Sequence, residues 1–216
     1  MRALACLFGV TIDRSGIRLL KAATAPASVI ALVASVGGLE AVGQVLAGLP
    51  GTLDATVLVL LHQQPDRTGN LVHLLSERSI LPVSAAEEAQ RLGSGEVLIA
   101  PAGKHLLIAS GPTVRLILSG AAPPSRPSAD LLLTSMALTL GTEAVAVVLS
   151  GNGHDGATGA TAIHAFGGTV LATDEATSQV FSMPDATIRR DHAIDHITPL
   201  EELPALLVAI VSGTTG

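Results

Sequence analysis

Runs of apolar residues of strand length alternate with amphipathic stretches along most of this chain. The strongest runs are Val29–Ala34, Thr56–Leu61 and Ala144–Leu149, where nearly every position is apolar. Shorter runs of the same kind occupy Val97–Ala100 and Thr169–Ala172. A strand that is apolar on both sides is typical of a parallel sheet with both faces covered. The pattern therefore predicts an α/β fold, a doubly wound and mostly parallel sheet with helices on both faces.

Helical periodicity and helix-boundary residues mark the segments between these runs. Ser128 precedes a stretch that places Leu132, Met136 and Leu140 on one face, so we expect Ser128 to be the N-cap of this helix. The other predicted helices are Leu39–Leu49, Asn70–Ser76, Ala157–Ala165 and Pro199–Val211. Two further apolar runs, on either side of Gly111-Pro112, predict a β-hairpin. Its expected strands are Leu106–Ser110 and Thr113–Leu118.

The length of 216 residues fits one ordinary domain with a sizeable core. We expect this domain to span residues 28–212, after a poorly ordered extension, residues 1–27, and before a short tail, residues 213–216. The chain begins with a short apolar run, Ala3–Val10, that is similar to a signal-peptide core. Charged residues follow that run at once and the small-residue stretch comes late, so a poorly ordered leader is the simpler interpretation.

Composition argues against several classes of function. The net charge is −6, and the only aromatic residues are Phe8, Phe166 and Phe181. Nucleic acids are bound by basic surfaces and aromatic stacking platforms, so we expect no nucleic-acid partner. No apolar run approaches the ~18 residues that span a bilayer, which predicts no membrane insertion. The single cysteine, Cys6, excludes an internal disulfide and is compatible with a reducing cytoplasm.

Three short polar loops carry the candidate chemistry, and each follows one of the strong apolar runs. They hold Ser35, then His62, then Asp155 within Gly151-Asn152-Gly153-His154-Asp155-Gly156. The carboxyl ends of parallel strands lie at one edge of a sheet, where ligands and reacting groups collect. A serine, a histidine and an aspartate at one edge are the parts of a hydrolytic triad. We therefore predict a serine nucleophile, a histidine base and an orienting carboxylate.

The first two loops also have simpler interpretations when each is taken alone. Ser35 stands where an N-cap serine would stand, and a loop carbonyl alone would satisfy His62. The glycines after Ser35 permit a tight turn and the close approach of a substrate to the backbone. The remaining histidines form no pair with metal-ligand spacing, so we expect no metal ion and no cofactor.

The third loop has a second interpretation, because Gly151, Gly153 and Gly156 form G-x-G-x-x-G between a strand and a helix. This is the dinucleotide fingerprint, and Asp174 after the next strand would bind the ribose in a nucleotide-binding oxidoreductase. Asp155 argues against this alternative, since its charge would lie beside the pyrophosphate. The charge argument and the coincidence of three loops favour the triad.

A series of segments in the chain matches, in order, the motifs of one known family. These segments are Ala34–Gly38, His62, Ile99–His105, Arg126–Asp130, Leu149–Gly156, Asp174–Ala176 and Val180–Pro184. From about Ser28 to Val211 the chain resembles the catalytic domain of the chemotaxis receptor methylesterases, the CheB-type protein-glutamate methylesterases. The resemblance implies a doubly wound parallel sheet with an antiparallel edge hairpin. Typical members also carry an N-terminal receiver domain, for which residues 1–27 leave no room, so we expect no regulation by a receiver of its own.

The resemblance implies a serine hydrolase that removes methyl groups from glutamyl methyl esters of chemoreceptors and also deamidates receptor glutamines. It implies Ser35 as nucleophile, His62 as general base and then acid, and Asp155 as orienting carboxylate. The expected partner is a helix of a methylated chemoreceptor, and the expected location is the cytoplasm. Backbone groups expected to bind the oxyanion and substrate are those of Val36, Gly37, Asn152 and Gly153.

Departures from the family pattern surround the predicted triad. Val36 stands where the family usually has threonine, and Asn152 stands where it usually has methionine. Gln63-Gln64-Pro65-Asp66 and Asn70 replace a Met-Pro-Pro segment and an aromatic residue that usually follow the histidine. These changes leave the exact protein substrate open. They also keep a catalytically weakened receptor-interaction module as an alternative.

Overall fold

The computed structural model describes residues 10–13, 16–19, 26–63, 70–120 and 126–214. Strands β1 (Val10–Asp13) and β2 (Gly16–Leu19) pair as an antiparallel two-stranded sheet that the apolar pattern did not predict. The other residues of the expected extension up to residue 25, and residues 215–216 of the expected tail, lie outside the described residues.

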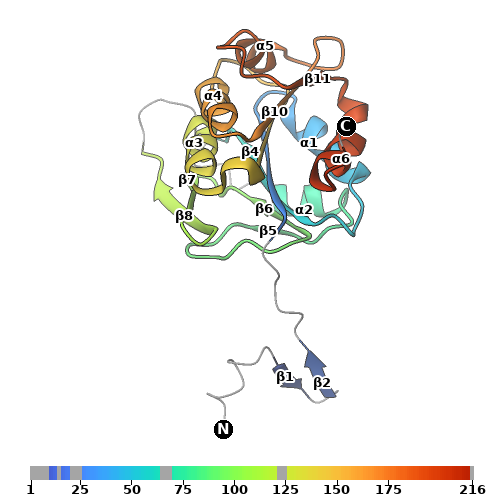
Figure 1. The fold of residues 1–216 in the computed structure, drawn as a ribbon. Helices are drawn as coiled ribbons and strands as arrows, with labels where there is room; N and C mark the ends of the chain where they lie inside the picture. Colours follow the sequence, from blue (N-terminus) through green and yellow to red (C-terminus); the bar gives the residue numbers. More distant parts are fainter. Residues whose placement is uncertain (1–9, 14–15, 20–25, 64–69, 121–125, 215–216) are drawn as a thin grey trace.

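The centre of the fold is a seven-stranded sheet in which every pairing is parallel (Figure 1). The strand order is β11-β10-β9-β3-β4-β6-β5. The strands are β3 (Ser28–Ala34), β4 (Ala55–Leu61), β5 (Val83–Ala85), β6 (Glu96–Ile99), β9 (Ala144–Val148), β10 (Thr169–Thr173) and β11 (His196–Thr198). The β3–β4 register runs unbroken to Ala34 opposite Leu61, so both strands end level at the same edge.

Alternate residues of the central strands enter two separate hydrophobic cores. In β3, Val29, Ala31 and Val33 belong to one core, whereas Ile30 and Leu32 belong to the other. All five side chains are buried, so the strand has no solvent-facing side. This two-sided burial is the reason why the sequence shows continuous apolar runs instead of an alternating pattern.

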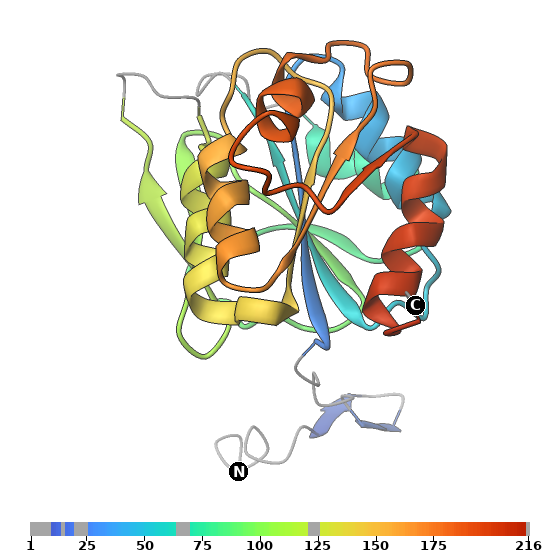
Figure 2. The same cartoon turned by 45° about the horizontal axis from the view of Figure 1, so that its top comes forward.

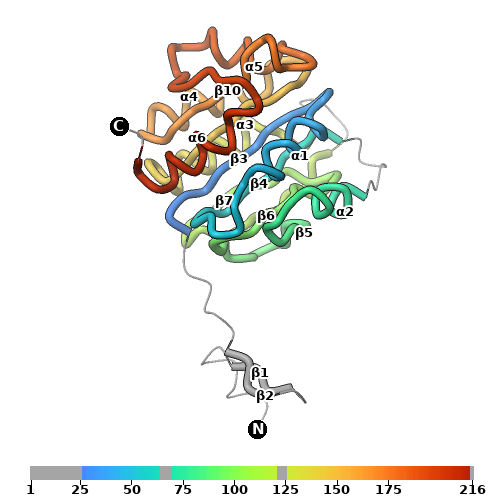
Figure 3. Tube along the Cα trace, turned by 90° about the vertical axis from the view of Figure 1, so that its right-hand side faces the viewer, coloured from blue at the N-terminus to red at the C-terminus, as the bar shows by residue number. Residues whose placement is uncertain are grey.

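Helices cover both faces of the sheet, which confirms the predicted doubly wound class. One face carries α3 (Ala129–Leu140), α4 (Ala157–Ala165) and α5 (Ser182–Ile188). The other face carries α1 (Gly38–Gly48), α2 (Leu71–Ser76) and α6 (Leu203–Val211). Figure 2 shows α3 and α4 on one side of the sheet and α1 and α6 on the other, and Figure 3 views the molecule from the side of α1 and α6.

The predicted antiparallel hairpin forms, as a two-stranded sheet separate from the seven-stranded one. Strands β7 (Lys104–Ala109) and β8 (Thr113–Leu118) pair antiparallel in a sheet of their own. Strand β8 pairs with β7 along one edge, and α3 lies against β7 along the other. Ile108 N–H donates to Ser135 Oγ at 2.9 Å, and Thr139 Oγ1 donates to Ile108 O at 3.0 Å. Polar side chains of α3 therefore satisfy backbone groups of β7 that a neighbouring strand would otherwise pair.

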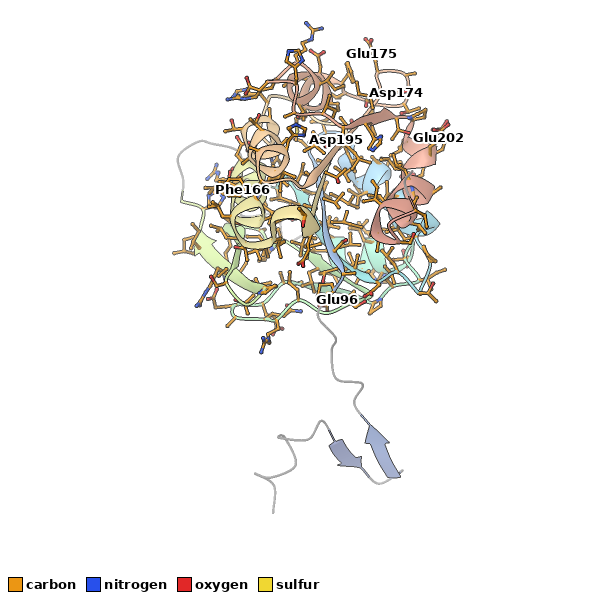
Figure 4. All side chains as sticks on the ribbon, viewed as in Figure 1. Glu96, Phe166, Asp174, Glu175, Asp195 and Glu202 are labelled. Atoms are coloured by element: carbon orange, nitrogen blue, oxygen red, sulfur yellow. The ribbon has the colours of Figure 1, made fainter. Side chains whose placement is uncertain are left out.

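The strand order changes direction between β9 and β3, because the chain leaves β3 toward β4 and later returns on the other side to β9. In open α/β sheets the crevice at such a switch point, outside the carboxyl ends of the strands, is the usual binding site. Figure 4 shows the two edges of the sheet: Asp174, which follows β10, lies at the carboxyl edge, and Glu96, the first residue of β6, lies at the other. The loops after β3 and β9 flank the switch point.

Candidate active site

A short hydrogen bond joins His62 and Asp155 at the carboxyl edge of the sheet. His62 Nε2 lies 2.8 Å from Asp155 Oδ2. His62 directly follows β4, and its backbone N–H donates to Ala34 O at 3.1 Å, which extends the β3–β4 ladder by one step. Asp155 comes from the loop between β9 and α4. The sheet thus brings together two of the three residues predicted for the triad.

Four donors hold the Asp155 carboxylate. Besides His62, Oδ2 accepts from Ala129 N–H at 2.7 Å, and Oδ1 accepts from Asp130 N–H and Ser128 Oγ, both at 3.1 Å. Ser128 is the N-cap of α3, as predicted, so the carboxylate lies at the positive end of a helix. Burial by itself raises the pKa of Asp155, but the hydrogen bonds from His62, Ala129 and Asp130 outweigh it and hold this pKa below its ordinary value.

An ionised Asp155 determines which ring nitrogen of His62 carries the hydrogen. The carboxylate has no proton to donate, so His62 Nε2 must be the donor in the bond between them. Nδ1 is then the nitrogen with a free lone pair. The arrangement can therefore take up a proton at Nδ1 while Asp155 holds the ring and stabilises its charged form.

Asp155 also makes the stability of the fold depend on pH in a defined direction. Its pKa is lowered by folding, so the carboxylate stabilises the folded state above the unfolded pKa, and this contribution is lost as the pH falls through the folded pKa. We expect Asp155→Asn to unfold more easily than wild type by about 1–3 kcal/mol at neutral pH. The difference should shrink below about pH 4. Urea unfolding of both proteins at pH 7 and pH 3 measures this difference in the free energy of unfolding. A difference that is larger at pH 3 than at pH 7 would contradict a lowered pKa of Asp155 in the folded state.

Ser35 directly follows β3 and stands beside His62 at the edge of the sheet. Its N–H donates to Ser150 O at 3.0 Å. The interpretation of Ser35 as a helix N-cap is wrong, because Gly37, with φ +78°, is the N-cap of α1 and no side chain caps that helix. The Ser35 hydroxyl makes no hydrogen bond to any residue in the described ranges, His62 included. In hydrolases without substrate the bond between nucleophile and base is often long, so this geometry is compatible with a triad.

Ser150 ties the loop after β3 to the segment that leads into α5. This buried side chain donates from Oγ to Val36 O at 2.8 Å and accepts from Val180 N–H at 2.9 Å. Gly151 N–H also donates to Val180 O at 2.9 Å. The loops after β3 and β9 and the segment before α5 therefore form one hydrogen-bonded unit. The sequence analysis did not predict this role of Ser150. Its position between a buried strand and a glycine-rich loop could have indicated it.

Glycines allow the backbone of these loops to lie close to Ser35. A Cβ on Gly151 would overlap Met183 Sδ and would lie 3.0 Å from Ser35 Cβ. A Cβ on Gly37 would lie 2.6 Å from Gln179 Oε1. No larger side chain fits at either position without moving its neighbours. The third loop is therefore held directly against the candidate nucleophile.

The four expected oxyanion donors differ in availability. The N–H groups of Val36, Gly37 and Asn152 donate to none of the residues that the structure describes. Gly153 N–H, in contrast, donates to Ser182 Oγ at 3.2 Å, and that hydroxyl donates to Gly153 O at 3.1 Å. Gly153 is thus the least suited of the four to bind an oxyanion.

The third loop is poorly suited to a pyrophosphate. Gly156 N–H and Gly159 N–H, at the start of α4, both donate to Asp130 Oδ1, at 3.0 Å and 2.8 Å. A dinucleotide would need such N–H groups at the helix N-terminus. Asp174, the expected ribose ligand of this alternative, accepts from Thr177 N–H and Thr177 Oγ1. The geometry therefore argues against the dinucleotide interpretation.

His105 is buried beside the site, and the sequence analysis gave it no function of its own. Its Nδ1 accepts from Ser128 N–H at 2.9 Å. Burial lowers the pKa of His105, although the nearby Asp155 charge raises this pKa in part. An Nδ1 that accepts the bond from Ser128 carries no hydrogen, so this bond requires the neutral ring, and the lowered pKa favours the same form.

Comparison with known proteins identifies the family. A family model described as CheB methylesterase matches residues 30–207. The chain belongs to the CheB methylesterase family. The crystal structure of the CheB methylesterase catalytic domain of Thermotoga maritima matches with a TM-score of 0.78 and 31% sequence identity, over 85% of this chain and 98% of that one.

Curated relatives carry methylesterase names. A protein-glutamate methylesterase/protein-glutamine glutaminase of Moorella thermoacetica is 39% identical over 189 residues, and the protein-glutamate methylesterase FrzG of Myxococcus xanthus is 37% identical over 183 residues. These matches cover 86% and 85% of this chain, but 44% and 54% of the relatives. The chain therefore spans about half the length of these curated relatives.

Proposed function

We propose that this chain is a serine hydrolase that demethylates glutamyl methyl esters of chemoreceptors and deamidates receptor glutamines. Ser35 is the nucleophile, His62 the general base and Asp155 the orienting carboxylate. The observation that carries the proposal is the 2.8 Å bond between His62 Nε2 and Asp155 Oδ2, next to the end of the strand that delivers Ser35. The names of the relatives supply the reaction class. The proposed catalytic domain is residues 28–212, with residues 213–216 as a tail.

Acylation begins when Ser35 Oγ attacks the ester carbonyl of a methylated glutamate. His62 Nδ1 takes the hydroxyl proton, and Asp155 stabilises the resulting imidazolium. The negative charge on the carbonyl oxygen is bound by the available N–H groups of Val36, Gly37 and Asn152, each worth roughly 3–4 kcal/mol. His62 then returns the proton to the methoxy oxygen, and methanol leaves.

Deacylation repeats the cycle with water as the nucleophile. His62 Nδ1 takes a proton from water as the water oxygen attacks the glutamyl–Ser35 ester. The tetrahedral intermediate collapses, Ser35 Oγ regains a proton from His62, and free glutamate leaves. With a glutamine substrate the leaving group of the first step is ammonia. Each step uses side chains that are already in the site.

The partner of this site is a helix of a methylated chemoreceptor. The surface beside Ser35 supports such a partner, because Val36 is 47% exposed and Leu39 is 37% exposed at the start of α1. Apolar side chains around a polar site are suited to a protein substrate. None of the helices in the described ranges is long and apolar enough to cross a membrane. We propose a cytoplasmic location, which suits the single cysteine and the methylesterase function.

Methanol release from a panel of methylated chemoreceptor fragments tests the proposal. We expect kcat/KM to be higher for the receptor fragments than for small methyl esters, because the surface around Ser35 contacts only the larger substrates. Equal values for both would overturn the receptor assignment. No release from any fragment, together with retained binding, would favour the alternative of a catalytically weakened interaction module.

A further inference from the structure

The first turns of α3 and α4 are each capped by an acidic residue of the other segment. Asp155, in the loop before α4, accepts from the N–H groups of Ala129 and Asp130, the first two residues of α3. Asp130, in α3, accepts from the N–H groups of Gly156 and Gly159 at the start of α4. The two aspartates therefore exchange helix caps across one interface.

The two helix starts lie very close together, so this exchange has an electrostatic effect as well. A Cβ on Gly159 would lie 2.6 Å from Leu133 Cβ and 3.1 Å from Asp130 Cα. Both N-termini carry partial positive charge and repel each other at this distance. The two carboxylates lie between them and offset that repulsion. Removal of either acceptor leaves unpaired N–H groups in a crowded interface.

We propose that Asp130 is a positioning residue of the triad, acting through the cap exchange on Asp155. Gly156 directly follows Asp155, so the bond from Gly156 N–H to Asp130 Oδ1 fixes the backbone from which the Asp155 side chain projects. Gly153 and Gly156 both have positive φ, +90° and +102°, and glycines give this loop no rigidity of their own. Without Asp130 the loop is free to shift, and Asp155 Oδ2 moves away from His62 Nε2. This inference rests on the proposed function.

Two substitutions of Asp130 separate its acceptor from its charge. Asp130→Asn keeps an Oδ1 acceptor, and asparagine caps helices about as well as aspartate, so we expect kcat of the same order as wild type. Asp130→Ala removes the acceptor and should lower kcat by about 10²-fold with KM nearly unchanged, since misplacement of a catalytic group by about 1 Å has this effect. Asp185→Ala is the matched control, because Asp185 lies in the first turn of α5 and its side chain bonds only Arg189 within the part of the chain that the structure describes.

The proton of the His62–Asp155 bond supplies a readout that does not depend on turnover. A downfield ¹H NMR resonance, assigned by its loss in His62→Gln, should be present in wild type, Asp130→Asn and Asp185→Ala. It should be absent or shifted in folded Asp130→Ala. An unchanged resonance and unchanged kcat in Asp130→Ala would overturn the proposal. It would also be overturned if Asp130→Asn behaves like the alanine variant, or if Asp130→Ala loses activity with the resonance intact.

The resonance also distinguishes failure of this inference from failure of the proposed function. If wild type hydrolyses no ester, the function is wrong, yet the spectra of the Asp130 variants still report whether Asp130 holds Asp155 against His62. If Asp130→Ala does not fold, Asp130→Glu tests the same point, because the longer side chain keeps the charge but displaces the acceptor. A wild-type resonance in that variant would contradict the proposal.

Discussion

Replacement of Ser35 by alanine is expected to abolish ester hydrolysis while the fold stays intact. The hydroxyl is the only group removed, and the Cβ that lies against the third loop remains. Removal of a serine nucleophile lowers kcat by at least about 10⁴-fold, because the remaining groups bind the oxyanion but form no acyl-enzyme. Turnover of a small methyl ester measures the loss, and the circular dichroism spectrum and unfolding midpoint check the fold.

The matched control for this variant is Ser182→Ala. Ser182 is another serine at the same edge, and among the described residues its Oγ bonds only to the backbone of Gly153. We expect this variant to retain turnover near the wild-type value. Wild-type turnover in Ser35→Ala, or a comparable loss in both variants, would contradict the role given to Ser35.

Replacement of Asp155 by asparagine is expected to lower kcat by about 10⁴-fold. The carboxamide presents an N–H donor where the carboxylate has only acceptors, so it favours the His62 tautomer that carries hydrogen on Nδ1. That tautomer has no lone pair available for the Ser35 proton. The same substitution also disturbs the bonds from Ala129 and Asp130 at the start of α3.

Single-turnover kinetics with an activated ester measure the acylation step in Asp155→Asn. The rate constant of acylation should fall, whereas the substrate dissociation constant should stay nearly unchanged. The reason is that Asp155 acts through His62 and does not contact the substrate. Glu88→Gln serves as control, since Glu88 is an exposed carboxylate that bonds Arg115 and the β8 backbone. Acylation at the wild-type rate in Asp155→Asn would remove Asp155 from the mechanism.

The strands that carry the site are predictable from the sequence because they are long and apolar on both sides. The predicted strands at Val29–Ala34, Thr56–Leu61 and Ala144–Leu149 differ from β3, β4 and β9 by a single residue each. Residues directly after such strands must lie at the carboxyl edge of a parallel sheet. The edge positions of Ser35 and His62 follow from this rule alone, whereas Asp155 comes later, near the end of the loop between β9 and α4.

Short elements at the periphery have no comparable signal. Strands β5 (Val83–Ala85) and β11 (His196–Thr198) contain three residues each and are only partly buried, so no apolar run marks them. Helix α5 contains Pro184 in its first turn, and a proline in so short a segment favours the prediction of a loop. The predicted helix Pro199–Val211 divides into a 3₁₀ turn, Leu200–Glu202, and α6.

The contacts that orient the triad are also invisible in the sequence. Asp130 and Asp155 lie in separate segments, and their cap exchange depends on two helix starts meeting in space. The ring orientation of His62, with Nε2 toward Asp155, follows from the side-chain geometry and not from any spacing of residues. The alternative interpretation of Ser35 as an N-cap fails because Gly37 caps α1, and a glycine cap leaves no polar residue to recognise in the sequence.

Covalent labelling tests most directly the central claim that Ser35 is activated by His62. The protein is incubated with a fluorophosphonate, and peptide mass spectrometry locates the adduct. The account predicts one phosphonyl group per chain on Ser35 in wild type, and no labelling in His62→Ala. An adduct on another serine, or labelling of Ser35 at an unchanged rate in His62→Ala, would contradict it.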